Sequence, residues 1–494
     1  MTSVQTETGI LAGEQRMLID GELQPAASGA TFGVEHPANE TVVGDVADGS
    51  VHDMERAVGA ARRAFDETDW SRDTDFRFHC LTQLHEALQR NQERLRRILV
   101  TEVGCPISVT GSQIESPIDE VRHWAEYGRD FDYLVDTGLH DTPLGPARRK
   151  LHHEPLGVVG AITPWNVPFY LNIAETIPAL MAGNTVVLKP AQLTPWSGTE
   201  LGRIIAEETD IPAGVFNVVT SNANEVGAAL SADPRVDMIT FTGSTATGRA
   251  ILAAGAATVK KNLLELGGKS AHIVLDDADL SACLPLAAMM ACVMSGQSCI
   301  LPSRILLPRS RYEDGLAILK ASMEGFPMGD PWTPGVMQGP QISAAQRCKV
   351  FGLIEAGTDS GARLVTGGGM PENLPVGYYV QPTLLADVDP NSVVAQEEIF
   401  GPVLTVTPYD SVDEAIAIAN NTIYGLSGEV SGADVERAFS VATRMRTGNV
   451  TINGKSHFGI DSPFGGTGQS GLGYRNGAPG YLEYLHIKTI GMPE

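Results

Sequence analysis

Short apolar segments alternate with helical patterns between residues 157 and 255, and this alternation constrains the fold more than any other feature of the chain. Four of the segments have the length and composition of buried strands: GVVGAI (157–162), NTVVL (184–188), VFNVV (215–219) and VDMITF (236–241). Helical patterns separate or follow them at 172–182, 197–208, 224–232 and after the GSTATG motif at 243–248. Strands joined by helices at this spacing form crossover units, so the sequence predicts an α/β fold with a parallel sheet.

Residues 51–134 carry charged and apolar positions at helical spacing, as in the segments 54–65 and 81–104. These segments are predicted to be amphipathic helices whose charged faces lie in solvent. Because 494 residues are too many for one ordinary hydrophobic core, two or three lobes are expected.

The charge of the chain limits its partners. The formal net charge is -24 and the isoelectric point is about 4.8. Such a field repels phosphate backbones and anionic lipid, so binding to nucleic acid or to a membrane surface is not expected. Residues 1–15 lack the basic and apolar regions of a secretory signal. The six cysteines show no zinc-like spacing, so we expect free thiols in a reducing cytoplasm and no metal site.

One stretch, residues 280–303, carries no charge and is long enough to span a bilayer. Pro285, Gly296 and several serines interrupt it, and basic and aromatic anchors do not flank it. We therefore predict a buried helix from about Leu286 to Met294, followed by a turn that presents Cys299.

Three predicted strands end at polar or glycine-rich motifs: TPWNVPF (163–169), KPAQLTP (189–195) and TGSTATG (242–248). Ligands of parallel sheets bind beyond the carboxyl ends of the strands, so these ends are candidate sites. The third motif leads into a helix whose free N–H groups suit a pyrophosphate, although its glycines could serve only a tight turn. GTGQSG (466–471) fits the dinucleotide fingerprint, but too little chain follows for a βαβ unit, which favours a plain glycine loop.

Two further residues have a structural and a chemical interpretation. Cys299 follows small or polar residues, unlike Cys283 and Cys292, which lie among aliphatic ones. An isolated cysteine is more often a packing residue than a nucleophile. Glu265 lies in an apolar segment before a glycine pair, where it is either a paired structural carboxylate or a general base with a raised pKa.

Seven motifs in order decide between these alternatives: TPWNVPF, AGNTVVLKPA, FTGSTATG, LELGGKS, GQSC, QEEIFGPV and SPFGGTGQSGLG. Together they resemble the NAD(P)-dependent aldehyde dehydrogenase superfamily over residues 17 to 490. The resemblance implies a glutamate about 34 residues before the catalytic cysteine, and Glu265 precedes Cys299 by 34. It implies that Cys299 attacks the aldehyde, that Asn166 and the Cys299 backbone N–H bind the oxyanion, and that Glu265 activates water to hydrolyse the thioester.

The resemblance also implies a set of contacts to NAD, with NADP possible. Lys189 and Glu398 would bind the two riboses and Phe400 would pack near the nicotinamide; Trp165, Gly243 and Ser244 would complete the site. Gln192 stands where members that prefer NAD often have a glutamate that repels a 2′-phosphate. A neutral amide removes that repulsion, so weaker exclusion of NADP is expected.

The substrate tunnel is predicted from the same resemblance. Five positions would line it: Leu171, Ala174, Ile300, Phe458 and Phe464. Some relatives have a tryptophan where Ala174 stands, so a roomy, mostly apolar tunnel for medium-chain, terpenoid or aromatic aldehydes is expected. Lys455 is the one nearby cation that the sequence offers to a charged aldehyde.

The implied architecture has two doubly wound parallel-sheet domains and a small β bridging element. The dinucleotide-binding domain would comprise residues 1–132 and 156–267, the catalytic domain 268–465, and the bridge 133–155 with 480–494. YLHIKTI (484–490) alternates like a strand, and an exposed terminal strand favours a homodimer or homotetramer.

Two rival functions remain at this point. A CoA-acylating dehydrogenase would have no use for a water-activating Glu265. A non-catalytic structural protein on this fold would not need Cys299, Asn166, Lys189 and Glu398 together with that carboxylate.

Overall fold

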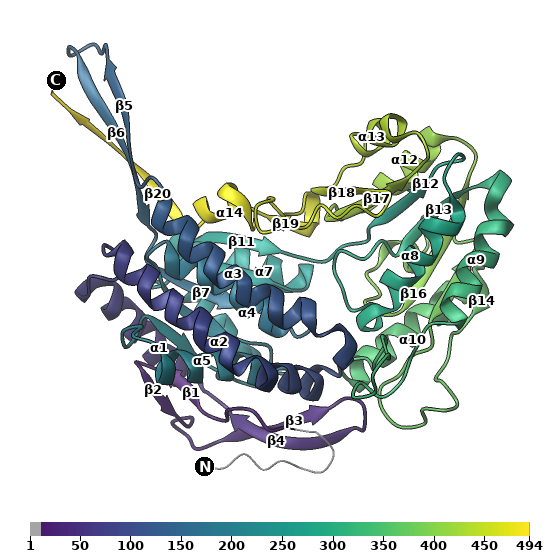
Figure 1. Ribbon diagram of the computed structural model, residues 1–494, viewed down its shortest axis with the longest axis horizontal. Helices are drawn as coiled ribbons and strands as arrows, with labels where there is room; N and C mark the ends of the chain where they lie inside the picture. The colour runs from purple at the N-terminus through teal and green to yellow at the C-terminus, as the bar shows by residue number, and fades with distance from the viewer. Residues whose placement is uncertain (1–10, 494) are drawn as a thin grey trace.

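The computed structural model describes residues 11–493, which form two lobes and a projecting arm (Figure 1). One lobe is built on an eight-stranded sheet, the other on a seven-stranded sheet, and the arm on a three-stranded sheet. Residues 1–10 lie outside the described residues. They include the start of the predicted dinucleotide-binding domain and most of the segment 1–15 that was examined for a secretory signal. Glu494, the last residue of the predicted bridge, also lies outside them.

The eight-stranded sheet is parallel at its centre and antiparallel at its edges. Its strands, in spatial order, are β19 (Gly471–Leu472), β11 (Lys261–Glu265), β10 (Met238–Thr242), β7 (Val158–Ile162), β8 (Thr185–Lys189), β9 (Phe216–Val218), β1 (Met17–Ile19) and β2 (Glu22–Gln24). The four strands predicted between residues 157 and 241 are all present, as β7, β8, β9 and β10.

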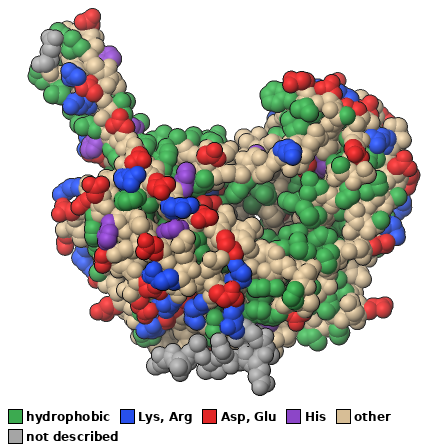
Figure 2. All heavy atoms as spheres, in the orientation of Figure 1, with side chains coloured by type: hydrophobic (Ala, Val, Ile, Leu, Met, Phe, Trp, Pro, Cys, Tyr) green, Lys and Arg blue, Asp and Glu red, His purple; other side chains and the backbone are tan. Residues whose placement is uncertain are grey.

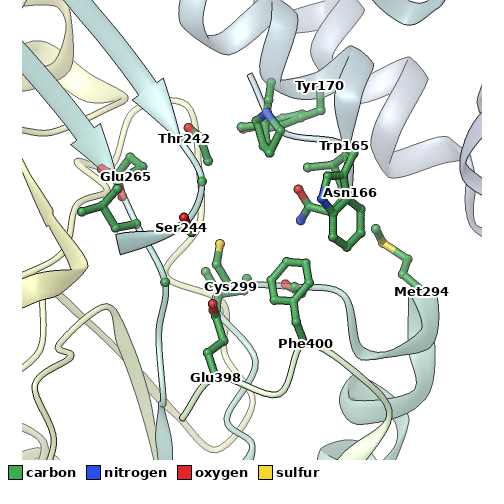
Figure 3. Close-up of a pocket in the computed structure, with 18 of the residues that line it drawn as sticks. Trp165, Asn166, Tyr170, Thr242, Ser244, Glu265, Met294, Cys299, Glu398 and Phe400 are labelled. Carbon is green, nitrogen blue, oxygen red and sulfur yellow. The ribbon is translucent and has the colours of Figure 1, made fainter. Parts of the chain in front are cut away.

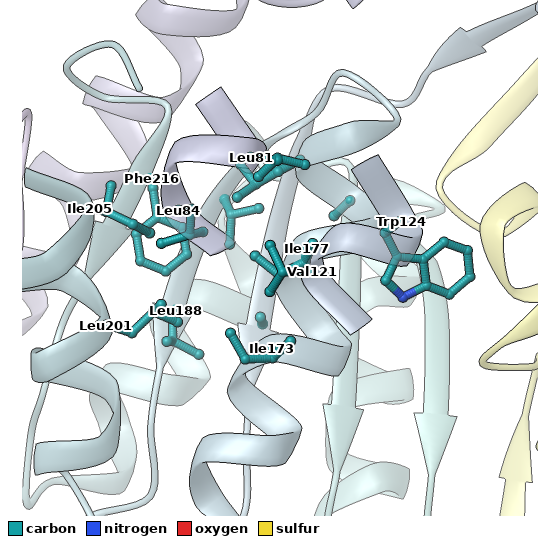
Figure 4. Close-up of a cluster of buried hydrophobic side chains, with 14 of the residues drawn as sticks. Leu81, Leu84, Val121, Trp124, Ile173, Ile177, Leu188, Leu201, Ile205 and Phe216 are labelled. Carbon is teal, nitrogen blue, oxygen red and sulfur yellow. The ribbon is translucent and has the colours of Figure 1, made fainter. Parts of the chain in front are cut away.

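Helices cover both faces of this sheet, as a doubly wound fold requires. One face carries α1 (Val51–Glu67), α6 (Asn224–Ala232) and α7 (Thr245–Gly255). The other carries α2 (Thr74–Val103), α3 (Gly111–Asp130), α4 (Pro168–Met181) and α5 (Trp196–Glu208). Because side chains of a strand alternate between faces, Val158 and Val187 pack on the first side, whereas Val159 and Val186 join the buried cluster shown in part in Figure 4.

The seven-stranded sheet is parallel except at its β14 edge. Its order is β14 (Arg363–Thr366), β15 (Thr383–Ala386), β16 (Val403–Tyr409), β13 (Arg304–Pro308), β12 (Ala271–Val274), β17 (Ser427–Ser431) and β18 (Asn449–Ile452). The helices of this lobe are α8 (Leu280–Cys292), α9 (Tyr312–Glu324), α10 (Ala344–Asp359), α11 (Val393–Gln396), α12 (Val412–Asn420) and α13 (Val435–Ala442). Buried apolar clusters lie on both sides of its strands, so the expected two-sheet α/β architecture is confirmed.

The arm is an antiparallel sheet in the order β20 (Leu485–Met492), β6 (Ala147–Pro155) and β5 (Leu134–His140). It extends away from the first lobe, and β20 has one edge without a partner strand in the part of the chain that the structure describes (Figure 1). The remaining elements are the hairpin β3 (Thr31–His36) and β4 (Thr41–Ala47), α14 (Gly477–Leu482), and five 3-10 turns at Ile107–Val109, Ala256–Thr258, Val293–Gly296, Arg309–Arg311 and Gly468–Ser470.

The helix before Cys299 begins earlier than the sequence pattern suggests. It starts at Leu280 instead of Leu286, because the Asp279 side chain caps it by accepting from the backbone N–H of Ser281. Pro285 lies inside this helix and does not end it. Over residues 11–493, no helix combines the length and the apolar character that crossing a membrane requires.

Asn184 ties the arm to the first lobe, and its loss is expected to destabilise the protein. Its Nδ2 donates to the carbonyl oxygens of Ala179 (3.1 Å) and Tyr484 (3.0 Å), and its Oδ1 accepts from the Gly157 N–H (2.9 Å). Asn184→Ala removes the side-chain partner of the Gly157 N–H and of the Tyr484 carbonyl oxygen, whereas the Ala179 carbonyl oxygen keeps the backbone N–H of residue 184. This loss should cost about 3 kcal/mol and lower the Tm by several degrees in a thermal melt. The exposed Asn222→Ala is the matched control, and an equal loss in both variants would contradict the assignment.

Candidate active site

A pocket of about 440 Å³ lies where the two lobes meet. Strands β7, β10 and β11 end at one edge of the first sheet, and the loops that follow them form one wall of the pocket. Hydrophobic side chains gather between the lobes on the face shown in Figure 2. Most of the predicted site residues line this pocket: Cys299, Glu265, Asn166, Trp165, Gly243, Ser244, Glu398, Phe400, Leu171, Ile300, Phe458 and Phe464.

A left-handed turn presents Cys299 to this pocket. Met294, Ser295 and Gly296 have φ values of 54°, 60° and 68° in succession. The first two residues adopt this conformation at an energetic cost, because a side chain disfavours positive φ. A Cβ on Gly296 would lie 2.1 Å from the carbonyl oxygen of Gly401, so only glycine fits at that position.

Hydrogen bonds from the second lobe hold the turn in place. The Ser295 hydroxyl donates to the Gly339 carbonyl oxygen (2.7 Å), and the Gln341 amide donates to the Ser295 carbonyl oxygen (2.8 Å). The Gln297 side-chain oxygen accepts from the backbone N–H of Ile342 (2.9 Å). These buried bonds offset the backbone strain and fix the position of the cysteine that follows.

The Cys299 thiol is half-buried and neutral at neutral pH. Burial raises its pKa to about 12, and the nearby Glu398 and Glu265 carboxylates act in the same direction, whereas Arg475 opposes them. Figure 3 shows Cys299 between Glu265 on one side and Asn166 with Phe400 on the other. The thiol therefore needs a nearby base or positive charge before it can react as a thiolate.

Glu265 is the last residue of β11 and is only 3% exposed. Within residues 11–493, neither of its carboxylate oxygens has a hydrogen-bond partner. Burial raises the pKa of Glu265 to about 8, with Arg475 lowering it and Glu175 raising it. A carboxyl group with this pKa can take up and release a proton near neutral pH, which is what a general base requires.

Asn166 lies in the loop between β7 and α4 and directs its amide toward the cysteine turn. Its Nδ2 donates to the Gln297 carbonyl oxygen at 2.9 Å. An amide nitrogen carries two hydrogens, so the second remains able to donate into the pocket. The side chain is thus held close to the backbone that leads to Cys299 (Figure 3).

Aromatic and polar groups line the part of the pocket expected to hold a cofactor. The rings of Trp165 and Phe400 pack edge to face, with centroids 5.3 Å apart. The Glu398 carboxylate accepts from the Gly268 backbone N–H at 2.9 Å, and burial raises its pKa. Ser244 is the N-cap of α7, where its hydroxyl accepts from the Thr247 backbone N–H.

Three predicted residues do not line the pocket. Lys189 ends β8, next to β7 in the sheet, and burial lowers its pKa to about 8. Gln192 is exposed on the loop that follows. Ala174 lies one helical turn beyond Leu171 on α4, and its single methyl group stays in the buried interior (6% exposed) instead of reaching the pocket wall.

Several pocket residues lie outside the sequence motifs, either on a distant segment or just beyond the end of a motif. Gln113 comes from α3, Tyr170 from α4, and Arg475 with Asn476 from the segment before α14.

The GTGQSG motif forms a 3-10 turn and β19, where the Ser470 hydroxyl donates to the Gly267 carbonyl oxygen (2.7 Å). It supports the strand end that carries Glu265 and belongs to no βαβ unit. Within residues 11–493, no group of three or more metal-ligating side chains is found.

Comparisons with known proteins agree with this geometry. The model of the aldehyde dehydrogenase family matches residues 24–490. A 3-succinoylsemialdehyde-pyridine dehydrogenase from a Pseudomonas species is 40% identical over 96% of this chain and 97% of its own length. A geranial dehydrogenase from Castellaniella defragrans is 38% identical over 96% of this chain and 98% of its own length.

Solved structures give the same result. The cysteine-to-alanine mutant of aldehyde dehydrogenase C from Pseudomonas syringae, in complex with NAD+ and octanal, is 38% identical and has a TM-score of 0.92, covering 97% of this chain and 96% of that one. Betaine aldehyde dehydrogenase from Staphylococcus aureus, in complex with NAD+, is 32% identical with a TM-score of 0.93, covering 97% and 94%. The chain therefore belongs to the aldehyde dehydrogenase family.

Proposed function

We propose that this aldehyde dehydrogenase oxidises an aldehyde to its carboxylic acid with NAD+, through a thioester on Cys299 that water attacks with Glu265 as general base. The observation that carries the proposal is the meeting of three groups in one pocket: a half-buried thiol, a buried carboxylate without a partner, and an amide donor on Asn166. Solved relatives in complex with NAD+ support the choice of cofactor.

The residues present fit a dinucleotide. Ser244 opens the N-terminus of α7, where backbone N–H groups favour a pyrophosphate, and Lys189 lies at the end of a nearby strand. Glu398 could accept hydrogen bonds from ribose hydroxyls, and the Trp165 and Phe400 rings offer apolar walls to a flat ring. NAD+, when bound, supplies the acceptor for the hydride that leaves the substrate carbon.

The protein side chains then perform the remaining steps. A water molecule in the pocket takes the proton of the Cys299 thiol, and the sulfur bonds to the aldehyde carbon as the π bond of the carbonyl breaks. The Asn166 amide with the Cys299 backbone N–H stabilises the negative oxygen that forms. Loss of hydride converts this adduct into a thioester. Glu265 takes a proton from water, the resulting hydroxide adds to the thioester carbon, and the carbon–sulfur bond breaks to release the acid and the thiolate.

We further propose that the substrate is a medium-chain, terpenoid or aromatic aldehyde. Leu171, Ile300, Phe458 and Phe464 give the pocket an apolar wall, and Phe458 packs against Phe464 with ring centroids 5.6 Å apart. Relatives of this kind support the proposal: one is solved with octanal and another is named for geranial.

The proposed assembly is a homodimer or homotetramer formed through the arm. The open edge of β20 presents unpaired backbone groups, and Ile487 and Ile490 on this strand are exposed. A second copy could cover both features by continuing the sheet.

All six cysteines are free thiols, which supports a cytoplasmic location for the enzyme.

The first test follows reduced cofactor at 340 nm with aldehydes from acetaldehyde to decanal, benzaldehyde and citral, with NAD or NADP and with or without CoA. Steady turnover that does not need CoA, is fastest on the larger apolar aldehydes, and disappears in Cys299→Ala is expected. The exposed Cys348→Ala should behave like wild type. A requirement for CoA, or binding of aldehyde without turnover, would favour the rival functions.

Gln192 is expected to weaken the exclusion of NADP. Gln192→Glu places a negative charge at this exposed position and should repel a 2′-phosphate, lowering kcat/KM for NADP by about tenfold or more while leaving NAD less affected. The measurement is the ratio of kcat/KM for the two cofactors. An unchanged ratio would show that Gln192 does not face the ribose.

Hydrolysis of the acyl-enzyme should depend on the ionisation of Glu265. Because burial raises its pKa to about 8, the carboxylate form is a minority at pH 7, and the hydrolysis rate should rise with pH to a plateau above about 8. Acylating Cys299 with a p-nitrophenyl ester and following loss of the acyl group by mass spectrometry isolates this step. Glu265→Gln should slow it by about 10²–10⁴ and abolish the pH dependence, whereas the exposed Glu355→Gln should change neither.

A further inference from the structure

A buried ion pair lies beside the proposed general base. Glu175 on α4 is completely buried, and Arg475, in the segment between β19 and α14, is 8% exposed. The Arg475 guanidinium forms a direct ion pair with the Glu175 carboxylate. Arg475 and Glu265 both line the pocket, so the cation of this pair lies in the same pocket as the base.

The sheet directs hydrogen-bond donors to Glu175 and none to Glu265. Thr242 pairs with Glu265 across β10 and β11, and it donates its hydroxyl to Glu175. Thr240, two residues earlier on the same face of β10, also donates to Glu175, and Arg475 contacts both Glu175 and Thr242. Glu175 therefore receives three donors, whereas both oxygens of Glu265 are buried without a partner.

Arg475 is the cation that acts on both carboxylates. Among residues 11–493 its ion pair is with Glu175, none joins it to Glu265, and its Nε is buried without a partner. The charged and titratable groups of this cluster affect one another's pKa electrostatically. The pKa of Glu265 responds to Arg475 and Glu175, and that of Cys299 responds to Glu398, Glu265 and Arg475. The pKa of Arg475 responds to Glu175, Glu265, Tyr484 and Tyr170, and Arg475 itself lowers the pKa of Glu120.

The Arg475 guanidinium lies near two buried carboxylates, Glu175 and Glu265, and the carboxylate with which it forms the direct ion pair determines how strong a base Glu265 is. An arginine in direct contact with a carboxylate stabilises its charged form and weakens it as a base, typically by 1–3 pKa units. Contact with Glu175 holds the guanidinium where it touches no reacting atom. Glu265 then feels Arg475 only at a distance, and burial remains the main influence on its pKa.

We propose that Glu175 is a positioning residue for the general base: by holding the Arg475 guanidinium it keeps Glu265 free of a direct ion pair and available to take a proton from water. This role rests on the proposed function of Glu265 in hydrolysis of the thioester. Glu175 touches neither substrate nor cofactor in this scheme and acts through Arg475.

The test is the pH dependence of acyl-enzyme hydrolysis in Glu175→Gln, measured with the p-nitrophenyl ester. Without an anion at residue 175 the guanidinium should turn to Glu265, so the midpoint should move to lower pH by about one unit or more and the plateau rate should fall about tenfold or more. In the double variant Glu175→Gln/Arg475→Gln both charges are gone, and the midpoint should return to within about half a unit of wild type. If Glu175 were needed only for packing, its loss would lower the rate, but the midpoint would not fall in the single variant and then return in the double variant.

Two controls make the result specific. Glu200 is also completely buried and paired with arginines, but it lies on α5 and does not line the pocket, so Glu200→Gln should lose stability and keep the wild-type midpoint. Removing one partner of a buried ion pair is strongly destabilising, whereas replacing both is often tolerated. If Glu175→Gln does not fold, Glu175→Asp takes its place, since a shorter carboxylate retreats from Arg475 and must still move the midpoint to lower pH.

The outcomes separate the two proposals. If Glu265→Gln keeps the pH dependence, Glu265 is not the base and the role of Glu175 falls with it. If Glu265→Gln abolishes the pH dependence but the midpoint in Glu175→Gln equals that of wild type, or the double variant shifts further in the same direction, only the role of Glu175 is overturned.

Discussion

The burial of one carboxylate without a hydrogen-bond partner is the constraint on which the pocket depends. Charging Glu265 costs free energy because burial removes most of its hydration, so its pKa rises to about 8. The same sheet that buries it places Thr242 beside it in register and turns that hydroxyl toward Glu175. The parallel strands thus place Glu265 at the strand end that faces the pocket, and they direct the nearby Thr242 donor to Glu175 and not to Glu265.

The nucleophile is positioned by both lobes together. Its turn adopts positive φ at Met294 and Ser295, and two groups of the second lobe, the Gly339 carbonyl oxygen and the Gln341 side-chain amide, stabilise it by bonding to Ser295. The first lobe contributes Asn166, which reaches across to the Gln297 carbonyl oxygen. A change in the angle between the lobes would therefore alter the distance between the amide and the cysteine before it altered either lobe's core.

The sequence predicts the parts of the site that have a local signal. Strand period and the rule that ligands bind at carboxyl ends located the motifs that contain Asn166 and Ser244, and the family resemblance singled out these two residues and connected Glu265 with Cys299. Gln113 had no such signal, because only the tertiary fold brings α3 to the pocket, whereas Tyr170 and Arg475 lie just beyond motifs that did not mark them. The start of α8 was predicted too late because Pro285 was interpreted as an interruption, although the Asp279 cap fixes the helix upstream of it. The orientation of Ala174 around its helix axis is likewise a property of packing, not of sequence order.

The pocket takes its residues from widely separated parts of the chain, and this determines at which stage of synthesis and folding the pocket can form. Asn166 and Glu265 belong to the first lobe and Cys299 to the second, whereas Ser470 and Arg475, which buttress the base, lie on either side of β19, the last strand of the first sheet to be made. As the ribosome extends the chain, the reactive cysteine emerges long before the groups that organise its surroundings. Until those last segments dock, the groups that the proposed hydrolysis needs are not assembled around Cys299, so catalysis arises only when folding is complete.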